Sequence, residues 1–423
     1  MKYKSVRGTK DIFKPESSEW QRIEDKARKI FAVYGYGEIR TPIMEETGLF
    51  VKSVGEDTDI VKKEMFSFQD RGERDITLRP EGTAPIVRAY LEHNLDKTEP
   101  FQKLYYIGPM FRAERPQAGR LRQFQQIGVE AIGSSSPALD AEVINLAIKL
   151  LESFGVVGSH LAINNLGCRE DKSKLSAILK DTFTKKPAAG LLCDDCKRRS
   201  STNPLRILDC KNESCRNIVR KTFKEIDFLC PDCVLHFEQT IRFLDLLGVK
   251  YAVDPYIVRG LDYYTRTVFE ISHDKLGAQN AIGAGGRYDN LISDMGGTAT
   301  GAFGFALGVD RVIMAINELD GASARPEQGL GLFIATIGEE GYRKAFSILN
   351  ELRAAGIACD IDYESSSLKS QMRRADKIKA KFVLIIGDDE VRKGEAVLRD
   401  MNTKEQINVN IEDIVKTVKG KIL

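Results

Sequence analysis

The chain has 423 residues, of which 42% are hydrophobic and 29% are charged, and its formal net charge is +2. The length exceeds what one hydrophobic core usually holds and predicts two to three domains, while the composition excludes a disordered chain and a coiled rod. A net charge near zero also excludes a protein that binds nucleic acid by bulk charge, so any such contact must use local basic patches.

The chain carries no signal for secretion or for a membrane span. Residues 1–8 lack the apolar core of a signal peptide, and no apolar run approaches the length of a membrane-spanning helix. Six of the eight cysteines lie within residues 193–233, a crowding that indicates a local metal site rather than a secreted disulfide framework. We therefore predict a cytoplasmic protein with no membrane partner.

Helix and strand signals alternate in the first part of the chain. Residues 17–34 predict an amphipathic helix, because its apolar residues, from Trp20 to Phe31, recur with helical spacing behind a serine that can cap it. A strand is predicted at 38–42, helices at about 83–93 and at 138–155, and further strands at 64–69, 75–79, 103–113 and 121–133.

Residues 160–250 differ in character, with clustered cysteines and charges. Strand signals resume at 251–258, 264–271 and 279–284, followed by a predicted turn at 285–289, a glycine-rich strand at 301–308 and a helix at 308–318. Strands that cluster with hairpin-like turns favour an antiparallel sheet.

A linker rich in Gly, Ala, Ser and Pro spans about 320–329 and precedes a second regular region. The order predicted there is strand 330–337, helix 339–355, strand 357–363, helix 367–380, strand 381–386, hairpin 394–411 and helix 411–420. This alternation predicts a compact α/β domain.

One polar segment, residues 108–130, predicts two strands joined by a long loop. Strand alternation places Arg112 and Glu114 on one face, and Gln126 and Glu130 on a shared face of the return strand. A buried strand face with these charges is costly unless a ligand or mutual pairing satisfies it. The alternative is a solvated face with paired charges.

A second segment, residues 259–270, reads Arg-Gly-Leu-Asp-Tyr-Tyr-Thr-Arg-Thr-Val-Phe-Glu, and its second half alternates as a half-buried strand. It places Arg259, Tyr263 and Tyr264 at one strand edge, beside a glycine that lets the backbone approach a ligand. Such an edge can hold an anion and an aromatic or polar small molecule. No GxGxxG or P-loop follows any strand, so a bound nucleotide would be held by arginines.

Several segments, in this order along the chain, resemble the motifs of class II aminoacyl-tRNA synthetases. Motif 1 is matched by residues 17–42, motif 2 by 108–130, and motif 3 by 306–311 (Ala-Leu-Gly-Val-Asp-Arg). Within that class, three further segments resemble those of histidyl-tRNA synthetases. They are residues 77–83 (Thr-Leu-Arg-Pro-Glu-Gly-Thr), 259–270 and 285–289 (Gly-Gly-Arg-Tyr-Asp). The resemblance covers nearly the whole chain and is weakest in its middle region.

The resemblance implies an α+β fold. Residues 1–325 are expected to form a class II catalytic domain, an antiparallel sheet with helices, interrupted at about 168–240 by an insertion domain that holds the cysteine cluster. Residues 329–423 are expected to form a C-terminal α/β anticodon-binding domain. The likeness to motif 1 also implies a homodimer, with helix 17–34 and the strand ending at Pro42 at a two-fold interface.

The resemblance further implies an enzyme that activates L-histidine with ATP and transfers it to the 3′ end of tRNA(His), releasing AMP and diphosphate. Arginines suit the anionic transition state because each offers several fixed donors to phosphate oxygens. By resemblance, Arg112 and Arg259 act at the α-phosphate, Arg311 holds the γ-phosphate, and Glu114 belongs to the ATP site. Mg²⁺ is expected with ATP. Asp310 departs from the glutamate that is frequent before this last arginine.

The histidine site is likewise implied by resemblance. The residues matching the amino-group site are Glu81, Thr83 and Gln126; those bracketing the imidazole are Glu130 and Tyr264; and Tyr263 lines the pocket. A carboxylate at one ring nitrogen and a phenol at the other would reject glutamine or phenylalanine, because buried polar groups would be left unpaired. From the residues alone, Glu81 could instead cap the helix at 83–93.

The cysteines depart from many members of this family. The pairs Cys193–Cys196 and Cys230–Cys233 have the spacing of a tetrahedral four-cysteine site and predict a structural Zn²⁺ in the insertion, with two further cysteines between them. The alternative is a set of reduced thiols on a small domain. His236 is either a spare ligand or a residue on a helix surface.

Two basic runs are candidates for RNA contact. One comprises Lys369, Arg373, Arg374, Lys377, Lys379 and Lys381; the other comprises Lys185, Lys186 and residues 197–199. A solvated helix face is the alternative. By resemblance, the C-terminal domain meets the anticodon, the insertion the acceptor arm, and loop 115–122 the acceptor end, with a steep salt dependence.

A second hypothesis, from another functional class, is a synthetase-like regulatory subunit that binds histidine without catalysis, as in the non-catalytic paralogue that assists ATP phosphoribosyltransferase. Such relatives typically lack the signature that runs from Arg259 to Tyr264 and often lack the C-terminal domain. Both are present in this chain. Histidine-dependent exchange of diphosphate into ATP discriminates the two hypotheses.

Overall fold

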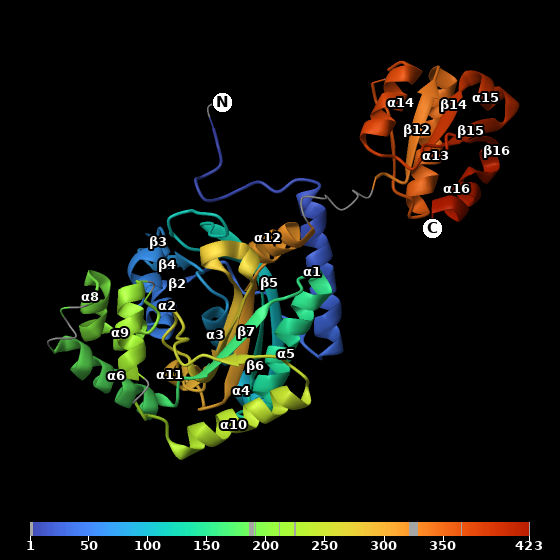
Figure 1. Cartoon of the computed structure of the whole chain (residues 1–423). Helices are drawn as coiled ribbons and strands as arrows, with labels where there is room; N and C mark the ends of the chain where they lie inside the picture. Colours follow the sequence, from blue (N-terminus) through green and yellow to red (C-terminus); the bar gives the residue numbers. More distant parts are fainter. Residues whose placement is uncertain are drawn as a thin grey trace. The chain divides into compact units, whose positions relative to one another are not determined.

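The computed structural model describes residues 3–185, 190, 192–210, 212–223, 226–320, 329–364 and 366–422. The chain forms two compact units, Met1–Ala322 and Ser323–Leu423 (Figure 1). The linker predicted at 320–329 falls mostly on residues 321–328, which lie outside the described residues.

The first unit is built on an eight-stranded sheet with the order β1-β5-β6-β11-β10-β9-β7-β8. The strands are β1 (Gly37–Glu38), β5 (Gln102–Phe111), β6 (Gln123–Ile132), β7 (His160–Asn165), β8 (Ala252–Val253), β9 (Thr265–Ser272), β10 (Ala281–Arg287) and β11 (Ala302–Gly308). All pairs from β5 to β7 are antiparallel, while the outer strands β1 and β8 pair in parallel with β5 and β7. The predicted antiparallel sheet is confirmed.

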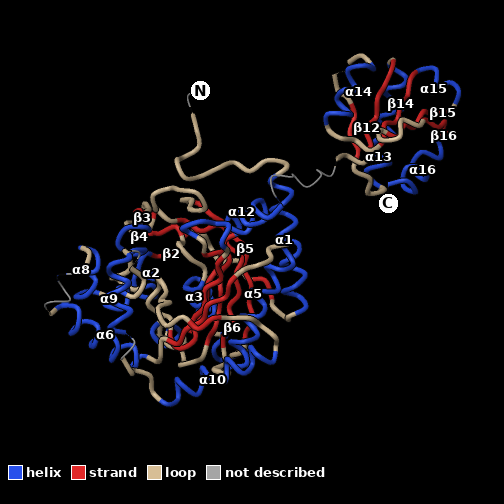
Figure 2. The backbone as a smooth tube through the Cα atoms, in the orientation of Figure 1, coloured by secondary structure: helices blue, strands red, loops and turns tan. Residues whose placement is uncertain are grey.

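Two hydrophobic cores lie against this sheet. One is formed with α1 (Glu16–Val33), α5 (Pro137–Phe154) and α12 (Val309–Asp320), and includes Leu244 of α10 (Pro231–Leu246). The other is formed with α3 (Thr83–Glu92) and the insertion, which comprises α6 (Arg169–Thr184), α8 (Asp194–Thr202), a 3₁₀ turn η2 (Pro204–Ile207) and α9 (Glu213–Phe223). Figure 2 shows the strands enclosed by helices, and Figure 1 shows α6, α8 and α9 gathered at one side of the unit.

Shorter elements complete the first unit. A three-stranded antiparallel sheet has the order β2-β4-β3, from β2 (Met44–Glu46), β3 (Phe66–Gln69) and β4 (Asp75–Leu78). The remaining turns and short helices are α2 (Thr47–Val54), η1 (Ile60–Glu64), α4 (Leu95–Thr98), η3 (Asp274–Gln279) and α11 (Leu291–Asp294).

Two predicted strands are much shorter than expected. The strand predicted at 38–42 is only β1, which is followed by Pro42, and the one predicted at 251–258 is only β8. After β8 the chain turns at Asp254, and Pro255 has no N–H with which to continue a ladder. Both strands lie at the two ends of the sheet order, where there is one neighbour to pair with.

The predicted turn at 285–289 is wrong, because Gly285 and Arg287 belong to β10 in the middle of the sheet. The glycines there serve close packing of neighbouring backbones: a Cβ on Gly285 would lie 2.2 Å from the carbonyl oxygen of Gly304. Glycine inside a strand marks such a close approach as readily as a turn.

The shared strand face predicted for Arg112 and Glu114 is also wrong, because β5 ends at Phe111. The Arg112 N–H still bonds the Arg122 carbonyl at 2.8 Å, but the next N–H, that of Ala113, turns to the carbonyl of Glu64 at 2.7 Å. The chain therefore leaves the sheet before Glu114, and strand alternation no longer applies.

A buried ion pair ties β10 to α5. Arg287 and Asp140 are both fully buried, and the Arg287 Nε donates to the two Asp140 oxygens at 3.1 and 3.3 Å. The other guanidinium nitrogens donate to the carbonyls of Ser134 (3.0 Å) and Ser136 (3.3 Å) and to Asp289 (2.9 Å). Because every nitrogen of this buried guanidinium has a hydrogen-bond acceptor, the ion pair fixes the geometry of the segments that carry it.

The second unit is a five-stranded sheet with the order β13-β12-β14-β15-β16. Its elements are β12 (Leu332–Ile337), α13 (Glu339–Ala354), β13 (Cys359–Ile361), α14 (Leu368–Lys377), β14 (Phe382–Gly387), α15 (Asp388–Lys393), β15 (Glu395–Asp400), β16 (Gln406–Asn410), η4 (Ile411–Asp413) and α16 (Ile414–Ile422). Residues of α13 and α16 share one hydrophobic core, and α14 covers a separate core around Phe333. The predicted α/β order is confirmed. Among the described residues no helix is both long and apolar enough to cross a membrane.

Candidate active site

Glu130 lies at the centre of a buried polar cluster in β6. Its side chain is 1% exposed, and it accepts hydrogen bonds from the Thr83 hydroxyl at 2.7 Å and from the Tyr288 hydroxyl. Burial raises the pKa of Glu130 to about 8, although both hydroxyl donors act in the opposite direction. The carboxyl is therefore mostly protonated at neutral pH.

The space for the Glu130 side chain depends on a glycine in the neighbouring strand. Gly304 of β11 pairs with Glu130 in the sheet register. A Cβ at Gly304 would lie 1.9 Å from Oε2 of Glu130. This close approach explains one glycine of the glycine-rich strand, and any larger residue would displace the carboxyl.

Glu81 is a second buried carboxyl, at the start of α3. Its oxygens accept the backbone N–H groups of Thr83 at 2.7 Å and Ala84 at 2.8 Å, and the Tyr263 hydroxyl at 3.3 Å. Burial raises the pKa of Glu81 above its ordinary value. The capping role considered from the sequence is thus present, in the same place as the expected histidine site.

Three tyrosine rings pack around these carboxyls. The ring centroids of Tyr263 and Tyr264 are 4.6 Å apart, and that of Tyr288 is 5.7 Å from Tyr263 in an edge-on contact. Burial raises the pKa of Tyr264 to about 12, so its hydroxyl keeps its proton and can donate. Together the rings form an apolar wall with three phenol groups.

Arg259 is held from two sides. Its Nη1 donates to Glu270 at 2.6 Å, and Nη1 of Arg206, in the insertion, donates to its backbone carbonyl at 3.1 Å. Within the described part of the chain, Nε of Arg259 is buried with no hydrogen-bond partner, and so is Oε1 of Gln126. A buried donor and a buried acceptor left unpaired are costly, and a ligand that pairs with them removes that cost.

Arg112 and Glu114 lie just beyond the end of β5. The Arg112 Nε donates to the Pro80 carbonyl at 3.0 Å, and its guanidinium lies over the Phe124 ring, 5.4 Å from the ring centre. Glu114 accepts from Arg120 at 2.7 Å, while its distance to Arg112 Nη1 is 3.9 Å. The contact with the Phe124 ring and the hydrogen bond to the Pro80 carbonyl fix Arg112, and its Nη1 lies at ion-pair distance from Glu114.

Arg311, at the start of α12, reaches the loop between β5 and β6. Its Nε donates to the Gly119 carbonyl at 3.0 Å, and its Nη1 donates to the carbonyl of Ala281. Burial lowers the pKa of Arg311, as does nearby Arg120. Both Glu114 and Glu270 act electrostatically on Arg311, so these charged side chains share one region.

The structure thus gathers the predicted residues into two adjoining groups. The carboxyl and phenol group holds Glu81, Thr83, Glu130, Tyr263 and Tyr264, and the arginine group holds Arg112, Glu114, Arg259 and Arg311. Electrostatic interaction of Arg112 with Glu81 and of Arg259 with Tyr264 connects the two groups.

Three partners were missed in the sequence. Tyr288 donates to Glu130, Glu270 accepts from Arg259, and Arg120 donates to Glu114. Tyr288 has a signal in the sequence, since it belongs to the matched segment 285–289, but the glycines of that segment predict a turn. The other two are pairings across space, for which sequence spacing gives no signal.

The predicted grouping of the cysteines is wrong, because the two CxxC pairs lie in separate clusters. Cys193 and Cys196 come together with Cys210 and Cys215, whereas Cys230 and Cys233 come together with Cys168 and Asp171, the ligand atoms in each group being within 4.8 Å of one another. The pairs separate because the first belongs to the start of α8 and the second to the start of α10. The CxxC spacing in the sequence identifies the two pairs, but it does not show which cysteines come together in space.

His236 is neither a ligand of these clusters nor a surface residue. Its ring is buried in α10, 3.7 Å from Asp140, and burial lowers its pKa to about 4. It is a neutral core histidine.

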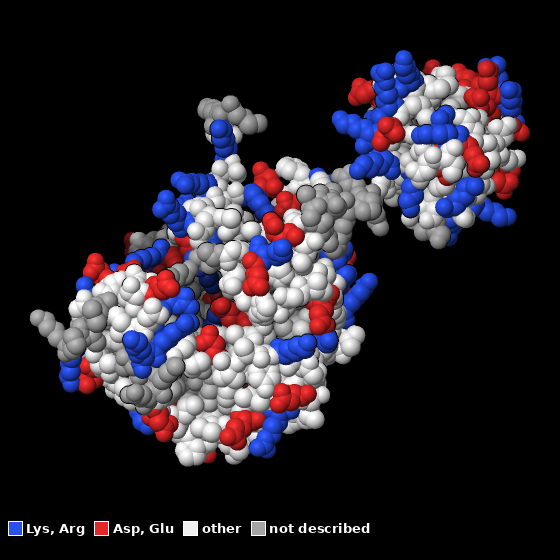
Figure 3. Space-filling model, in the orientation of Figure 1, with Lys and Arg blue, Asp and Glu red and all other residues white. Residues whose placement is uncertain are grey.

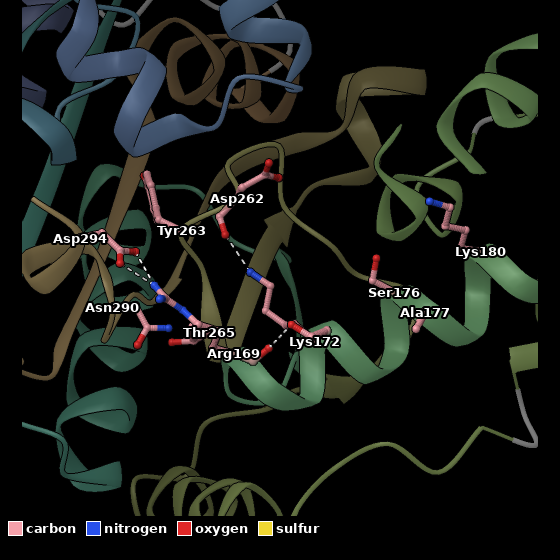
Figure 4. A pocket seen from close by; sticks show the side chains of 11 residues that line it. Arg169, Lys172, Ser176, Ala177, Lys180, Asp262, Tyr263, Thr265, Asn290 and Asp294 are labelled. Atoms are coloured by element: carbon pink, nitrogen blue, oxygen red, sulfur yellow. Dashed lines mark hydrogen bonds and ion pairs between the residues drawn. The ribbon is translucent and has the colours of Figure 1, made fainter. Parts of the chain in front are cut away.

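A cavity of about 470 Å³ lies next to the signature that runs from Arg259 to Tyr264 (Figure 4). It is lined by Asp262 and Tyr263 from that segment and by Arg169 and Lys172 from α6. Lys172 crosses to the signature and donates to the backbone carbonyls of Asp262 and Tyr264, each at 2.7 Å. The insertion is therefore in direct contact with the signature.

An antiparallel sheet with the buried carboxyl of Glu130 in β6 and with arginines just beyond β5 and ahead of β9, followed by a helix with Arg311 in its first turn, defines the catalytic domain of a class II aminoacyl-tRNA synthetase. A family model described as histidyl-tRNA synthetase matches residues 8–188 and 216–312, and one described as anticodon binding domain matches residues 332–421.

Individual relatives agree with the family models. The chain is 49% identical to a histidine–tRNA ligase of Halothermothrix orenii over 98% of this chain and 99% of that one, and 49% identical to one of Desulforamulus reducens over 98% of each. The crystal structure of apo histidyl-tRNA synthetase from S. aureus superposes with a TM-score of 0.81 at 37% identity, covering 99% of this chain and 100% of that one. The chain belongs to the histidyl-tRNA synthetase family.

Glu130→Gln is expected to change how stability depends on pH. The Glu130 carboxyl keeps its proton up to a pKa of about 8 in the folded chain, against an ordinary value of 4.5. Between these values the folded state binds more protons than the unfolded state, so the free energy of unfolding falls as the pH rises. Glu130 contributes at most about 1.4 kcal/mol per pH unit to this fall, and glutamine removes that contribution.

Urea unfolding between about pH 5 and about pH 9, followed by fluorescence, measures this slope. The single tryptophan, Trp20 in α1, reports on the first unit alone. The control is Glu318→Gln, at an exposed carboxyl of α12. Parallel pH curves for the wild-type chain and Glu130→Gln would contradict the prediction.

Proposed function

We propose that the chain catalyses ATP-dependent activation of L-histidine to histidyl-adenylate and transfers the histidyl group to the 3′ end of tRNA(His), releasing AMP and diphosphate. The observation that carries the proposal is the signature from Arg259 to Tyr264, which joins an arginine with an unpaired buried Nε to the phenol wall around Glu81 and Glu130. Membership of the family and full-length relatives named histidine–tRNA ligase support it.

In the proposed histidine site, Glu81, Thr83 and Gln126 receive the ammonium group. The unpaired Oε1 of Gln126 supports this assignment, because an acceptor buried without a donor suits an N–H group of a ligand. Glu130 and Tyr264 bracket the imidazole, and Tyr263 lines the pocket. A protonated Glu130 can donate to one ring nitrogen or share its proton with it, so the pair stays hydrogen-bonded either way.

In the activation step, a carboxylate oxygen of histidine attacks the α-phosphorus of ATP and diphosphate leaves. Arg112 and Arg259 hold the α-phosphate oxygens and the carboxylate, where negative charge is concentrated in the transition state, and Arg311 holds the γ-phosphate end. In the second step, a ribose hydroxyl at the 3′ end of the tRNA attacks the carbonyl carbon of the adenylate, and AMP leaves.

Mg²⁺ belongs to this proposal as a companion of ATP. Glu114 and Glu270 are partly buried carboxylates that both act electrostatically on Arg311, and oxygen ligands of this kind fit Mg²⁺ together with phosphate oxygens and water. These two residues would hold the ion, whose charge neutralises the departing diphosphate. Asp310 is engaged elsewhere, since it accepts the N–H of Gln125 at 3.2 Å.

The regulatory alternative has less support. A histidine-binding subunit without catalysis needs the pocket around Glu130 but has no need of the arginine group that surrounds it. Here Arg112, Arg259 and Arg311 are all present, and each donates a hydrogen bond to a backbone carbonyl or a carboxylate. The second unit is also complete, with an anticodon-binding model matching residues 332–421.

Arg259→Ala is expected to lower histidine-dependent exchange of diphosphate into ATP by about two to three orders of magnitude, because it removes a donor to the transition state. Histidine binding, measured by calorimetry, is expected to change by less than about twofold. The matched control is Arg74→Ala, at an exposed arginine paired with Asp70. An equal loss in exchange and binding would assign Arg259 to ground-state binding, and wild-type histidine binding without exchange would favour the regulatory alternative.

We propose that the second unit binds the anticodon region of tRNA(His), while the insertion and loop 115–122 approach the acceptor arm. On α14 and just beyond it, exposed basic side chains without an ion pair among the described residues are Lys369, Arg373, Lys377 and Lys381. Arg374 differs, because it is paired with Asp360 and Asp362. Figure 3 shows lysine and arginine side chains on the visible face of this unit.

Replacing Lys369, Arg373 and Lys377 together by alanine is expected to weaken tRNA binding and to flatten its salt dependence. Loss of three phosphate contacts lowers the slope of log K against log salt by about 2. The control replaces Arg343, Arg392 and Lys416 by alanine, which lie on α13, α15 and α16 rather than on α14. An equal effect of both triple variants, measured by filter binding, would contradict a local contact at α14.

We also propose a homodimer with α1 and the segment ending at Pro42 at its two-fold interface, as the likeness of residues 17–42 to motif 1 implies. On or next to these segments, Val33 of α1 is 85% exposed, and Ile43 and Met44, which follow Pro42, are 43% and 57% exposed. Exposed apolar side chains scattered singly are normal on a protein surface, so these residues serve as positions at which to test the interface.

Sedimentation equilibrium at micromolar concentration is expected to give twice the chain mass of 47.3 kDa. Val33→Glu combined with Met44→Glu is expected to shift the mass towards one chain, because charges are costly in a buried interface. Val157→Glu, at another exposed valine, is the control. A wild-type mass equal to that of one chain would contradict the proposed homodimer.

A structural zinc ion in the insertion is proposed for Cys193, Cys196, Cys210 and Cys215. Their sulfur atoms lie within 4.8 Å of one another, and those of Cys193 and Cys210 are 3.8 Å apart. Four thiolates around zinc at about 2.3 Å form a tetrahedron with edges of about 3.8 Å, whereas a disulfide needs about 2.05 Å. None of the eight cysteines forms a disulfide, which fits a reducing compartment, so we propose the cytoplasm as the site of action.

A further inference from the structure

A second cluster of ligand atoms lies where the insertion leaves and rejoins the sheet domain. Cys168 directly precedes α6, the first insertion helix, and Cys230 directly precedes α10, through which the chain returns. Asp171 and Cys233 follow three residues after each of them, in the first turns of the two helices. The four ligand atoms lie within 4.8 Å of one another, and Asp171 and Cys233 are buried.

We propose that this cluster is a second metal site, in which Cys168, Asp171, Cys230 and Cys233 bind one Zn²⁺ through three thiolates and one carboxylate. Sulfur and carboxylate oxygen are both established zinc ligands, at about 2.3 Å and about 2.0–2.2 Å. Binding releases the three thiol protons to solvent. The two helix N-termini favour the negative ligands that remain.

The geometry of Asp171 supports a ligand role. Its Oδ2 accepts the N–H of Cys168 at 3.2 Å, and its Oδ1 accepts the N–H of Cys230 at 3.0 Å. These bonds hold the carboxylate between the two helix starts and still leave lone pairs on both oxygens. Capping of the start of α6 explains why an aspartate stands at position 171, but it does not explain why three thiols surround its buried carboxylate.

A disulfide is a poorer explanation of the cluster. A disulfide between any two of these cysteines would use neither the third thiol nor Asp171, and it would leave the carboxylate buried beside apolar sulfur. A divalent cation uses all four groups and compensates the charge of Asp171. The chemistry of the complete set therefore points to a metal.

The position of the site gives it a structural role that is independent of the proposed reaction. Lys172, the residue after Asp171, donates to the carbonyl of Asp262 (Figure 4) and to that of Tyr264. The carbonyl of Gly167 accepts the N–H of Arg266 at 2.7 Å. A metal at Cys168 and Asp171 would fix the start of α6, which contacts residues 262–266 through these hydrogen bonds. It would also join the two ends of the insertion to each other.

The test is the metal content of the full-length protein after gel filtration. Two zinc ions per chain are expected in the wild type. Cys233→Ser is expected to retain one, Cys196→Ser is expected to retain one, and the double variant none. One zinc per chain that is lost in Cys196→Ser and kept in Cys233→Ser would overturn the second site, as would two zinc ions that both persist in Cys233→Ser.

A measurement on the wild-type protein keeps the test decisive if a cysteine variant fails to fold. X-ray absorption at the zinc edge is expected to show seven sulfur ligands and one oxygen ligand in total over the two ions, since the sites supply four thiolates, and three thiolates with one carboxylate. Four sulfurs around each ion, or zinc held by sulfur alone at one ion per chain, would exclude the proposed ligand set. Asp171→Asn tests the carboxylate, because the amide oxygen preserves one acceptor for the N–H groups while the oxygen signal and the affinity for zinc fall.

Discussion

The buried ion pair between Arg287 and Asp140 is the interaction on which the shape of the site depends. It anchors the last residue of β10 to α5, and Arg287 also holds Asp289, so the residue between them has little freedom. That residue is Tyr288, whose N–H bonds Ala302 and whose hydroxyl bonds Glu130. Breaking a buried pair of this kind costs about 3–5 kcal/mol, which is a large part of the stability of a typical domain. The phenol that meets Glu130 is thus positioned by a charge pair outside the pocket.

The pocket itself holds two buried carboxyls, and no basic side chain among the described residues forms a hydrogen bond to either. Glu81 is satisfied by backbone N–H groups and a phenol, and Glu130 by two hydroxyls. These donors compensate burial only in part, so the pKa of each carboxyl is raised. Glu81 raises the pKa of Glu130 further, and both carboxyls raise the pKa of Tyr263. A cationic ligand and a proton therefore compete for the same buried negative charge, and affinity for an ammonium group is linked to pH by the fold.

Most elements could be predicted because their signals are local. The helix at α1 and the alternation of the second unit follow from periodicity, and the antiparallel sheet follows from clustered strand signals. What could not be predicted depends on contacts across space. The two glycines before Arg287 predict a turn, whereas in the structure Gly285 serves close packing with β11. Arg112 leaves its strand because Ala113 finds a partner at Glu64. The two CxxC pairs lie in separate clusters. The CxxC spacing carries no information on which helix N-termini lie next to each other in the fold.

The insertion supports the segment from Arg259 to Tyr264 through direct hydrogen bonds. Strand β9 begins only at Thr265, so residues 259–264 lack a strand ladder of their own. In place of that ladder, Arg206 donates to the Arg259 carbonyl, and Asn203 donates to Asp262 at 3.2 Å. Lys172 bonds the carbonyls of Asp262 and Tyr264. Any ligand that displaces the insertion must break these bonds or carry the signature with it, and either response changes the backbone that presents Arg259 and Tyr264. A segment outside the sheet is therefore coupled by direct hydrogen bonds to the residues proposed to recognise phosphate and imidazole.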